Sequence, residues 1–211
     1  MGKRKIIDIQ AQKRRKNRRS IFLDDGSVFG ISEDVFFSIP VQIGDTLTDQ
    51  ELDDILVADY QQKILDFALN LLSYRMRSKV ELMHRLKRKK FNEDGIYSVM
   101  KILETKGYVD DQKFARAFAR EKVKRKLIGP IALRSEFSVH RLDPDILEYT
   151  IKKTYDEFPE HTLMDQLLAK RRVPMNKPLD ITEKKNAVNT LRNKGFSWDR
   201  IQEILVKRSN I

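Results

Sequence analysis

Residues 106–126, "KGYVDDQKFARAFAREKVKRK", place two adjacent carboxylates before a helix-like run that becomes steadily more basic. Asp110 and Asp111 stand directly before "QKFARAF". An Asp in this position accepts hydrogen bonds from the first amides of a helix, and its charge suits the positive end of the helix dipole. Gly107 supplies the left-handed residue that often ends the preceding helix. The stretch therefore predicts a joint between two helical units.

The two carboxylates also permit a catalytic interpretation, a metal-dependent nuclease. Such enzymes need several carboxylates that converge from different elements. The three histidines, His84, His140 and His161, are far apart and form no HExxH motif, and the chain has no P-loop, no GxSxG motif and no Cys. We therefore favour the capping role and expect neither an enzyme nor a bound metal or cofactor.

The run that follows the carboxylates separates into an apolar face and a basic face. Phe114 and Phe118 are one helical turn apart and are flanked by alanines, which is typical of a closely packed core face rather than a platform for stacked bases. The cations lie largely off that face: Arg116, Arg120, Lys122, Lys124, Arg125 and Lys126.

One pattern of apolar residues occurs three times. If Phe91, Leu142 and Phe196 are taken as equivalent, the positions nine and five residues before them, and five and nine residues after them, are apolar in every copy. These positions are Leu82, Leu86, Ile96 and Met100; Leu133, Phe137, Leu147 and Ile151; and Ala187, Leu191, Ile201 and Leu205. The residue after each anchor is a favoured N-cap: Asn92, Asp143 or Ser197. The spacings of 51 and 54 residues fit a repeat of three helices.

The first copy shows how its helices are expected to form. From Asp59 onward an apolar stripe has helical spacing: Ile64, Phe67, Ala68, Leu71 and Leu72. Ser78 and Glu81 have the spacing of a capping box, which predicts a second helix that buries Leu82 and Leu86. A third helix is expected after Asn92, with Ile96, Val99, Met100 and Leu103 on one face.

The first 58 residues have a different pattern. "KIIDIQAQ" and "RRSIFLDDGSVFGIS" are rich in β-branched and aromatic residues, and Asp24-Asp25-Gly26 predicts a hairpin turn. Thr48 and Glu51 then have the spacing of a capping box for a short helix. We expect a small β-hairpin domain that ends near Val57.

Together these patterns predict a mainly α protein in which tandem three-helix repeats form an elongated curved solenoid after a small N-terminal β-containing domain. The expected domains are residues 1–58 and three repeats at residues 59–108, 109–158 and 159–211. The third repeat is entered through "KRRVPMNKPLDITEKK" (170–185), whose two prolines favour a loop.

The charge is high and unevenly distributed. Forty-two Lys and Arg against 31 Asp and Glu give a net charge of +11. Residues 3–19, 74–90 and 116–126 carry nine, eight and six basic residues with one acid each, whereas residues 20–62 carry ten acids and no Lys or Arg. A solvated surface explains most charge runs, but three separate basic clusters favour a polyanionic partner. Without Cys, a signal-like apolar stretch or a membrane-length segment, a cytoplasmic protein with no membrane contact is expected.

Nucleic acid would be bound through its backbone. Lys and Arg on successive turns neutralise phosphates and release counterions, which gives affinity without reading sequence. The predicted helices carry few Asn or Gln beside Arg on one exposed face, so sequence-specific binding is the weaker hypothesis.

Two stretches resemble a known family. "LSYRMRSKVELMHRLKRKKF" followed by "GYVDDQKFARAFAREKVKRKLIGPIALRSEF" is similar to the RecX regulatory protein family, with its Arg-x-Arg-Ser, Gly-Tyr-x-Asp-Asp-x-x-Phe-Ala and Gly-Pro segments in this order. The resemblance is strongest over residues 72–137 and extends through the later repeats. It departs from the pattern at Lys90, where many relatives have Gly.

The resemblance implies a non-enzymatic modulator of the RecA recombinase that lies in the groove of the RecA–DNA filament and limits ATP hydrolysis, strand exchange and extension. Expected partners are RecA and DNA, single-stranded more than double-stranded, with the protein acting as a monomer. The candidate binding residues are basic: Arg75, Arg77, Lys79, Arg85, Lys87, Arg88 and Lys89, then Lys122, Lys124, Arg125 and Arg134. A stand-alone, non-specific DNA-binding protein remains the alternative.

Overall fold

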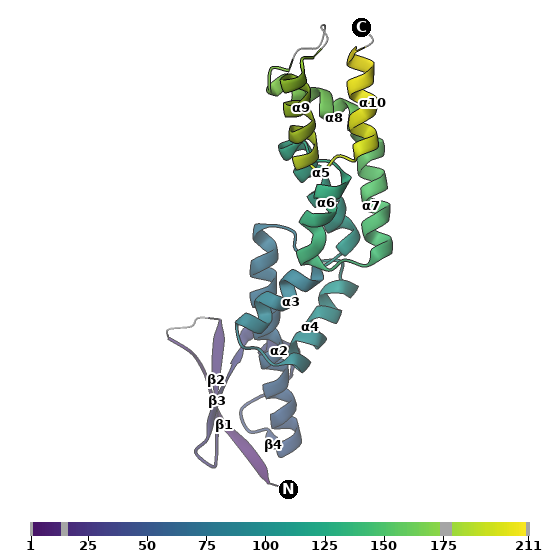
Figure 1. Cartoon of the computed structure of the whole chain (residues 1–211). Helices are drawn as coiled ribbons and strands as arrows, with labels where there is room; N and C mark the ends of the chain where they lie inside the picture. The colour runs from purple at the N-terminus through teal and green to yellow at the C-terminus, as the bar shows by residue number, and fades with distance from the viewer. Residues whose placement is uncertain (1, 14–16, 174–178, 210–211) are drawn as a thin grey trace. The chain divides into compact units, whose positions relative to one another are not determined.

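The computed structural model describes residues 2–13, 17–173 and 179–209 of the chain (Figure 1). The N-terminal elements are β1 (Lys3–Ala11), β2 (Arg18–Leu23), β3 (Val28–Ser32), α1 (Glu33–Ser38) and β4 (Thr46–Thr48). The helices that follow are α2 (Asp49–Tyr74), α3 (Lys79–Arg88), α4 (Glu93–Thr105), α5 (Asp111–Lys126), α6 (Pro130–Phe137), α7 (Pro144–Glu157), α8 (Glu160–Lys170), α9 (Ile181–Asn193) and α10 (Trp198–Ser209), with a 3-10 turn at Ser138–His140. The prediction of a mainly helical protein with a small N-terminal β domain is confirmed. The predicted proline loop, with Pro174 and Pro178, lies outside the described residues.

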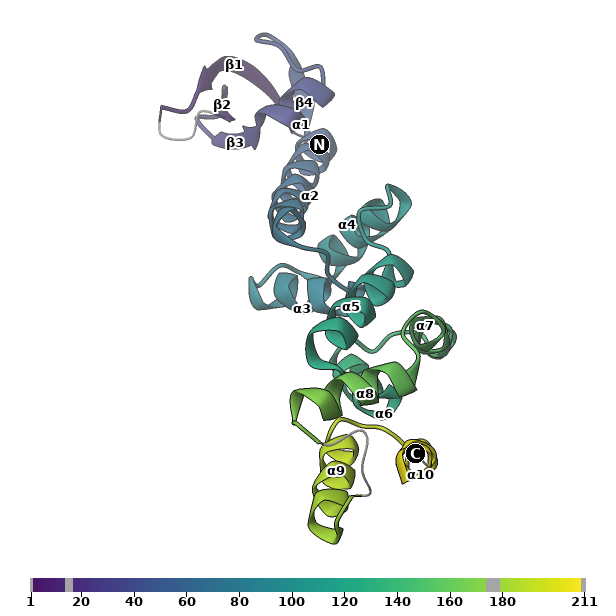
Figure 2. The same ribbon diagram turned by 90° about the horizontal axis from the view of Figure 1, so that it is seen from above.

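The N-terminal sheet is antiparallel in the order β3-β2-β1-β4. The predicted hairpin joins β2 and β3, where the Gly26 amide donates to the Leu23 carbonyl (3.1 Å) and Gly26 has φ of 81°. Figure 2 shows the strands curled round, with α1 and β4 beside the start of α2. Ile6, Ile21 and Ile31 are fully buried beneath this curved sheet. The strands and α1 therefore share one core with the first turns of α2, which contribute Ile55, Leu52 and Ala58.

The helix that follows the sheet is longer than predicted. The capping box of Thr48 and Glu51 is present, but the helix that it opens runs unbroken to Tyr74. No Gly or Pro interrupts residues 49–74, so nothing in the backbone stops the helix. The expected short helix and the first helix of the repeat are thus one element, and the expected boundary at residues 58/59 falls inside α2.

A buried carboxylate ties α2 to the sheet. Asp59 is 2% exposed and accepts hydrogen bonds from both Nη atoms of Arg18 (3.1 and 3.0 Å) and from the Ser32 amide (2.7 Å). Lys63 adds an ion pair at 2.7 Å. Burial disfavours the charged form, but these hydrogen bonds outweigh it and lower the pKa of Asp59 below its usual value. The sheet and α2 belong to one compact unit, which also holds residues 82–108.

The first repeat packs as expected. Leu82, Leu86, Val99 and Leu103 are fully buried, with Ile96 and Met100 at 2% exposure or less. The ring of Phe91 packs edge-on against Tyr60 and Phe67 of α2. The backbone amide of Asn92 donates to the hydroxyl of Tyr60 (2.9 Å), and its side chain accepts from the Gly95 amide (2.9 Å). Packing and capping therefore fix the turn from α3 to α4 together.

The second compact unit holds residues 76–81 and 109–211. Its core includes the predicted repeat positions of the second and third copies, with Leu133, Ala187, Leu191 and Ile201 fully buried. Asp143 and Ser197 cap α7 and α10, because their side chains accept from the amides of Asp145 (2.9 Å) and Arg200 (3.5 Å). The predicted N-caps are confirmed in all three copies.

A backbone feature unites the three turns. The residue before each anchor has positive φ: 66° at Lys90, 46° at Arg141 and 80° at Gly195. Only glycine adopts this left-handed region without cost. Lys90, which departs from the family pattern, therefore places a side chain at a position where the backbone conformation favours Gly.

Candidate functional site

The suspected catalytic pair caps two helices. Asp110 is the N-cap of α5 and accepts from the Lys113 amide (2.9 Å), which is the main cause of its lowered pKa. Asp111 accepts from the Lys79 amide at the start of α3 (2.8 Å). Within the described residues no group of three or more His, Asp or Glu side chains could hold a metal ion. The two carboxylates therefore accept hydrogen bonds at the N-termini of α5 and α3.

Phe114 and Phe118 contribute to the core, as predicted. Phe114 is 3% exposed, and both rings contact the buried imidazole of His140. The Nδ1 atom of His140 lies 3.0 Å from the hydroxyl of Ser78, which itself accepts from the Glu81 amide (3.2 Å). The start of α3 belongs to the second unit, and Ser78 and Asp111 hold it within that unit.

The candidate cations in and just after α3 that belong to the first unit are exposed. Lys87 pairs with Glu93 (2.6 Å), and the ammonium of Lys89 lies 5.8 Å from the centre of the Phe67 ring. Arg85 and Arg88 have no ion-pair partner within the described part of the chain. Arg75, just beyond the end of α2, is also exposed. Arg85 and Arg88 therefore carry the least compensated charge of this group.

Most candidate cations of the second unit are engaged with acidic side chains. Lys122 (2.6 Å) and Lys126 both bind Glu136, and their hydrogen bonds lower the pKa of that carboxyl. Arg134 forms a two-point contact with Glu148 (3.0 and 2.5 Å), whose hydrogen bonds raise the pKa of the guanidinium.

The remaining four candidates of this unit differ in exposure. Arg77 is only 8% exposed and bonds Glu81. Arg125 lies 3.7 Å from Glu121, and Lys124 projects over the Phe158 ring. Lys79 is exposed at the first turn of α3. The cation runs of the sequence are thus partly neutralised inside the fold.

The least neutralised basic surface lies in the third repeat, which sequence reasoning did not select. Six exposed cations near the end of α8 and along α9 have no ion-pair partner among the described residues: Lys170, Arg171, Arg172, Lys184, Lys185 and Arg192. The signal was present in the stretches "KRR" (170–172) and "EKKNAVNTLRNK" (183–194). Their cations are spread over two elements, so no single run stands out.

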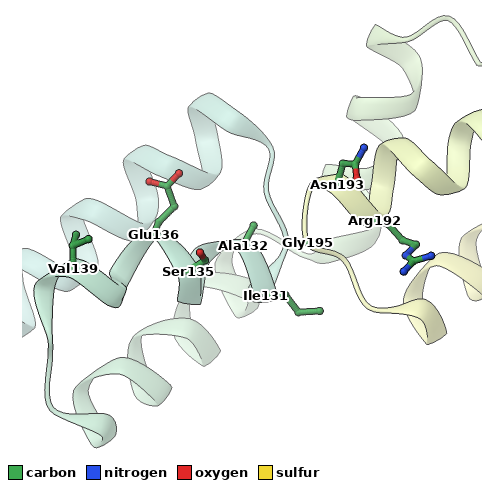
Figure 3. Close-up of a pocket in the computed structure, with 8 residues that line it drawn as sticks. All are labelled: Ile131, Ala132, Ser135, Glu136, Val139, Arg192, Asn193 and Gly195. Atoms are coloured by element: carbon green, nitrogen blue, oxygen red, sulfur yellow. The ribbon is translucent and has the colours of Figure 1, made fainter.

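Two clefts border this surface. One, of about 460 Å³, is lined by Arg171, Arg172 and the exposed side of α9. The other, of about 560 Å³, lies between α6 and the end of α9 (Figure 3). Asn193 lines both. In Figure 3, Arg192 and Asn193 leave the end of α9 in different directions, so α9 supplies polar groups to each cleft.

Comparison with known proteins gives the family. The regulatory protein RecX of Bacillus subtilis is 32% identical over 197 residues, which cover 93% of this chain and 74% of that protein. The chain belongs to the RecX family. A RecX of Staphylococcus carnosus is 26% identical over 95% of the chain and 74% of its own length. The matched part spans only 57% of the length of the Listeria welshimeri RecX, at 31% identity.

The structural matches agree with a RecX fold. Residues 65–111 match the family model described as RecX, first three-helix domain. A crystal structure of regulatory protein RecX superposes with a TM-score of 0.77 at 26% identity, covering 97% of this chain and 99% of that one. RecX from Lactobacillus salivarius has a TM-score of 0.62 at 24% identity over 73% of this chain, which shows a shared fold. Among the described residues of this chain, none of the helices has the length and the apolar composition of a membrane span.

Proposed function

We propose that this chain regulates the RecA recombinase by binding in the helical groove of the RecA–DNA filament, where it modulates ATP hydrolysis, strand exchange and filament assembly. The proposal is carried by the match along 93% of the chain to a protein named regulatory protein RecX. It acts in the cytoplasm as a monomer, by occupying the filament rather than by catalysis. Stacked three-helix repeats suit such a role because each adds binding surface for a periodic partner.

The candidate contacts are the exposed cations, which differ in whether binding a partner would break an internal ion pair. Arg85 and Arg88 are the first choice, because binding a polyanion there breaks no internal ion pair. Lys87, Arg134 and Arg125 would have to exchange Glu93, Glu148 and Glu121 for the partner. Arg77 is assigned a structural role, since its buried guanidinium is bonded to Glu81.

RecA-catalysed ATP hydrolysis on single-stranded DNA tests the proposal. Stoichiometric amounts of the purified chain are expected to lower the hydrolysis rate. An unchanged rate would rule out filament regulation. The Arg85→Glu, Arg88→Glu variant is expected to need at least about tenfold more protein for the same effect, which corresponds to about 1.4 kcal/mol of lost binding. Lys101→Glu, Lys106→Glu is the matched control, because both lysines are exposed in the same unit, Lys101 on α4 and Lys106 just after its end.

A stand-alone DNA-binding protein is the second candidate, favoured by the uncompensated cations of the third repeat. It predicts salt-dependent DNA binding without RecA, in which each lost phosphate contact lowers the slope of log K against log salt by about 0.7 on single strands. A chain that binds DNA but leaves RecA hydrolysis unchanged would favour this candidate over filament regulation.

A further inference from the structure

The cations of the third repeat surround a stripe of amides on α9. Asn186, Asn189 and Asn193 are spaced three and four residues apart, so they share one helix face. All three are exposed, and no described group bonds their side chains. Together they supply six amide donors and three carbonyl acceptors to solvent.

Helix stability does not explain this composition. Asn costs about 0.6 kcal/mol relative to Ala in a helix interior, because its side chain competes for the backbone. Asn186 and Asn189 lie inside this helix of 13 residues and oppose its formation where Lys, Glu or Ala would favour it, whereas Asn193 is its last residue. Exposed residues that oppose the helix propensity of their own segment indicate a binding role for that face.

The surroundings indicate the kind of ligand. Asn186, Asn189 and Asn193 line the cleft of about 460 Å³, whose other wall carries Arg171 and Arg172. Arg192 and Asn193 reach the neighbouring cleft, where Ile131 of α6 is 57% exposed and offers apolar surface. Cations beside hydrogen-bonding amides and an apolar contact match the phosphates, edges and faces of nucleotides.

We propose that the α8–α9 surface of the third repeat binds single-stranded nucleic acid directly, with phosphates on Arg171, Arg172 and Arg192 and base edges on the three asparagines. A single strand fits better than a duplex because unpaired bases can turn their hydrogen-bonding edges into a cleft. Glu183 also lines the cleft of about 460 Å³, where its carboxylate accepts from the Asp180 amide (3.0 Å). This negative charge favours an amino group of a base over a phosphate at that end. The inference rests on the second candidate function, direct DNA binding, and deepens it by naming the surface and the base contacts, which need no RecA.

Fluorescence anisotropy with two labelled oligonucleotides of equal length tests the site on the full chain without RecA. One is oligo-dA, whose base edge suits Asn, and the other is an abasic strand with the same phosphates. The unmodified chain is expected to bind oligo-dA at least about tenfold more tightly, about 1.4 kcal/mol, as expected for one amide–base pair.

Two sets of variants separate the two kinds of contact. Asn186→Ala, Asn189→Ala, Asn193→Ala is expected to remove the preference for oligo-dA and to leave abasic binding and the salt slope unchanged. Ala favours the helix, so this variant is expected to fold. Arg171→Ala, Arg172→Ala is expected to weaken both strands and to lower the salt slope by about 1.4 for two contacts. Controls are Asn70→Ala, an exposed amide of α2, and Lys152→Ala, Lys207→Ala, two exposed cations of the same unit.

Three results would overturn the proposal, whatever RecA hydrolysis shows. The first is equal affinity of the unmodified chain for oligo-dA and the abasic strand. The second is a triple asparagine variant that binds oligo-dA like the unmodified chain. The third is a polyglutamate peptide that binds as tightly as oligo-dA, which would make the surface a site for acidic protein segments.

Discussion

Two helix starts at equivalent places in the repeat are stabilised in opposite ways. At the start of α3, Ser78 and Asp111 satisfy the amides of Glu81 and Lys79 with side-chain oxygens. At the start of α6, 51 residues later, Gly129 has no side chain to cap with, and Pro130 has no amide hydrogen. There the amides of Gly129 and Ile131 donate to the backbone carbonyls of Lys194 (2.8 Å) and Gly195 (3.1 Å).

We call the first the carboxylate joint (Ser78, Asp110 and Asp111) and the second the glycine joint (Gly129, Lys194 and Gly195). The carboxylate joint depends on charge and hydrogen bonding, so it should respond to pH and accept polar replacements. The glycine joint depends on close backbone approach, so it should reject any side chain and ignore pH. The start of the second helix of a repeat is therefore stabilised by two physically different devices.

Gly195→Ala should break the glycine joint with the largest effect. A Cβ at this position would lie 2.3 Å from the backbone nitrogen of Ala132, and φ of 80° is unfavourable for Ala. Strain and overpacking together are expected to cost about 3 kcal/mol. The fluorescence of Trp198, the single tryptophan, reports urea unfolding of this unit.

Gly107→Ala is the matched control for Gly195→Ala, and because Gly107 lies in the first unit its urea unfolding is followed by far-UV circular dichroism rather than by Trp198. Gly107 also has positive φ, 71°, but a Cβ there meets nothing within 4 Å. It should therefore cost only the backbone strain, about 1 kcal/mol. Equal losses for the two variants would show that close approach contributes nothing at the glycine joint.

The contrast between the joints also shows what the sequence could predict. Asp110 was identified as a helix cap because capping is local: the side chain bonds an amide three residues away. The buried repeat positions followed from spacing in the same way. The glycine joint was not predicted, because Gly129 and Gly195 are 66 residues apart and only the packed repeats bring them together.

The candidate site was harder to predict for the same reason. Counting cations in "EKVKRK" cannot reveal that Lys122 and Lys126 share Glu136, which lies 14 and 10 residues away on another helix. Conversely, the cations of the third repeat occur in short runs that only α8 and α9 place on one surface. The local density of charge in the sequence does not predict which cations form ion pairs or which gather on one surface, because both depend on the tertiary structure.

Asp110 variants should sharpen the contrast through pH. Because the Lys113 amide lowers the pKa of Asp110 in the folded chain, this contribution to stability is present above the unfolded pKa. It is lost as the pH falls through the lower folded pKa. Asp110→Ala is expected to cost about 1 kcal/mol at pH 7, whereas Asp110→Asn should cost little, since Asn caps equally well.

Urea unfolding between neutral pH and pH 3 measures this dependence. The stability difference between the unmodified chain and Asp110→Ala should shrink as the pH approaches 3, and that between Asp110→Asn and Asp110→Ala should stay constant. Gly129→Ala, which should clash with the Gly195 carbonyl at 2.4 Å, provides a pH-independent loss for comparison. A difference for Asp110→Ala that does not change with pH would contradict a charged cap.

Lys90→Gly tests whether the turns gain from glycine where no close approach exists. Lys90 and Gly195 are equivalent positions with φ of 66° and 80°. Replacing Lys90 by Gly relieves the strain of the left-handed backbone, about 1 kcal/mol. Gly also makes the unfolded chain more flexible, and this entropy offsets about half of the gain in folding stability. A net gain of about 0.5 kcal/mol is expected, measured as slower amide hydrogen exchange in α4.

The control Lys89→Gly removes the same side chain one residue earlier, where φ is not positive, and should destabilise the turn. If both variants lowered protection equally, the positive φ at position 90 would give no preference for glycine. Close packing alone would then explain the glycine at position 195.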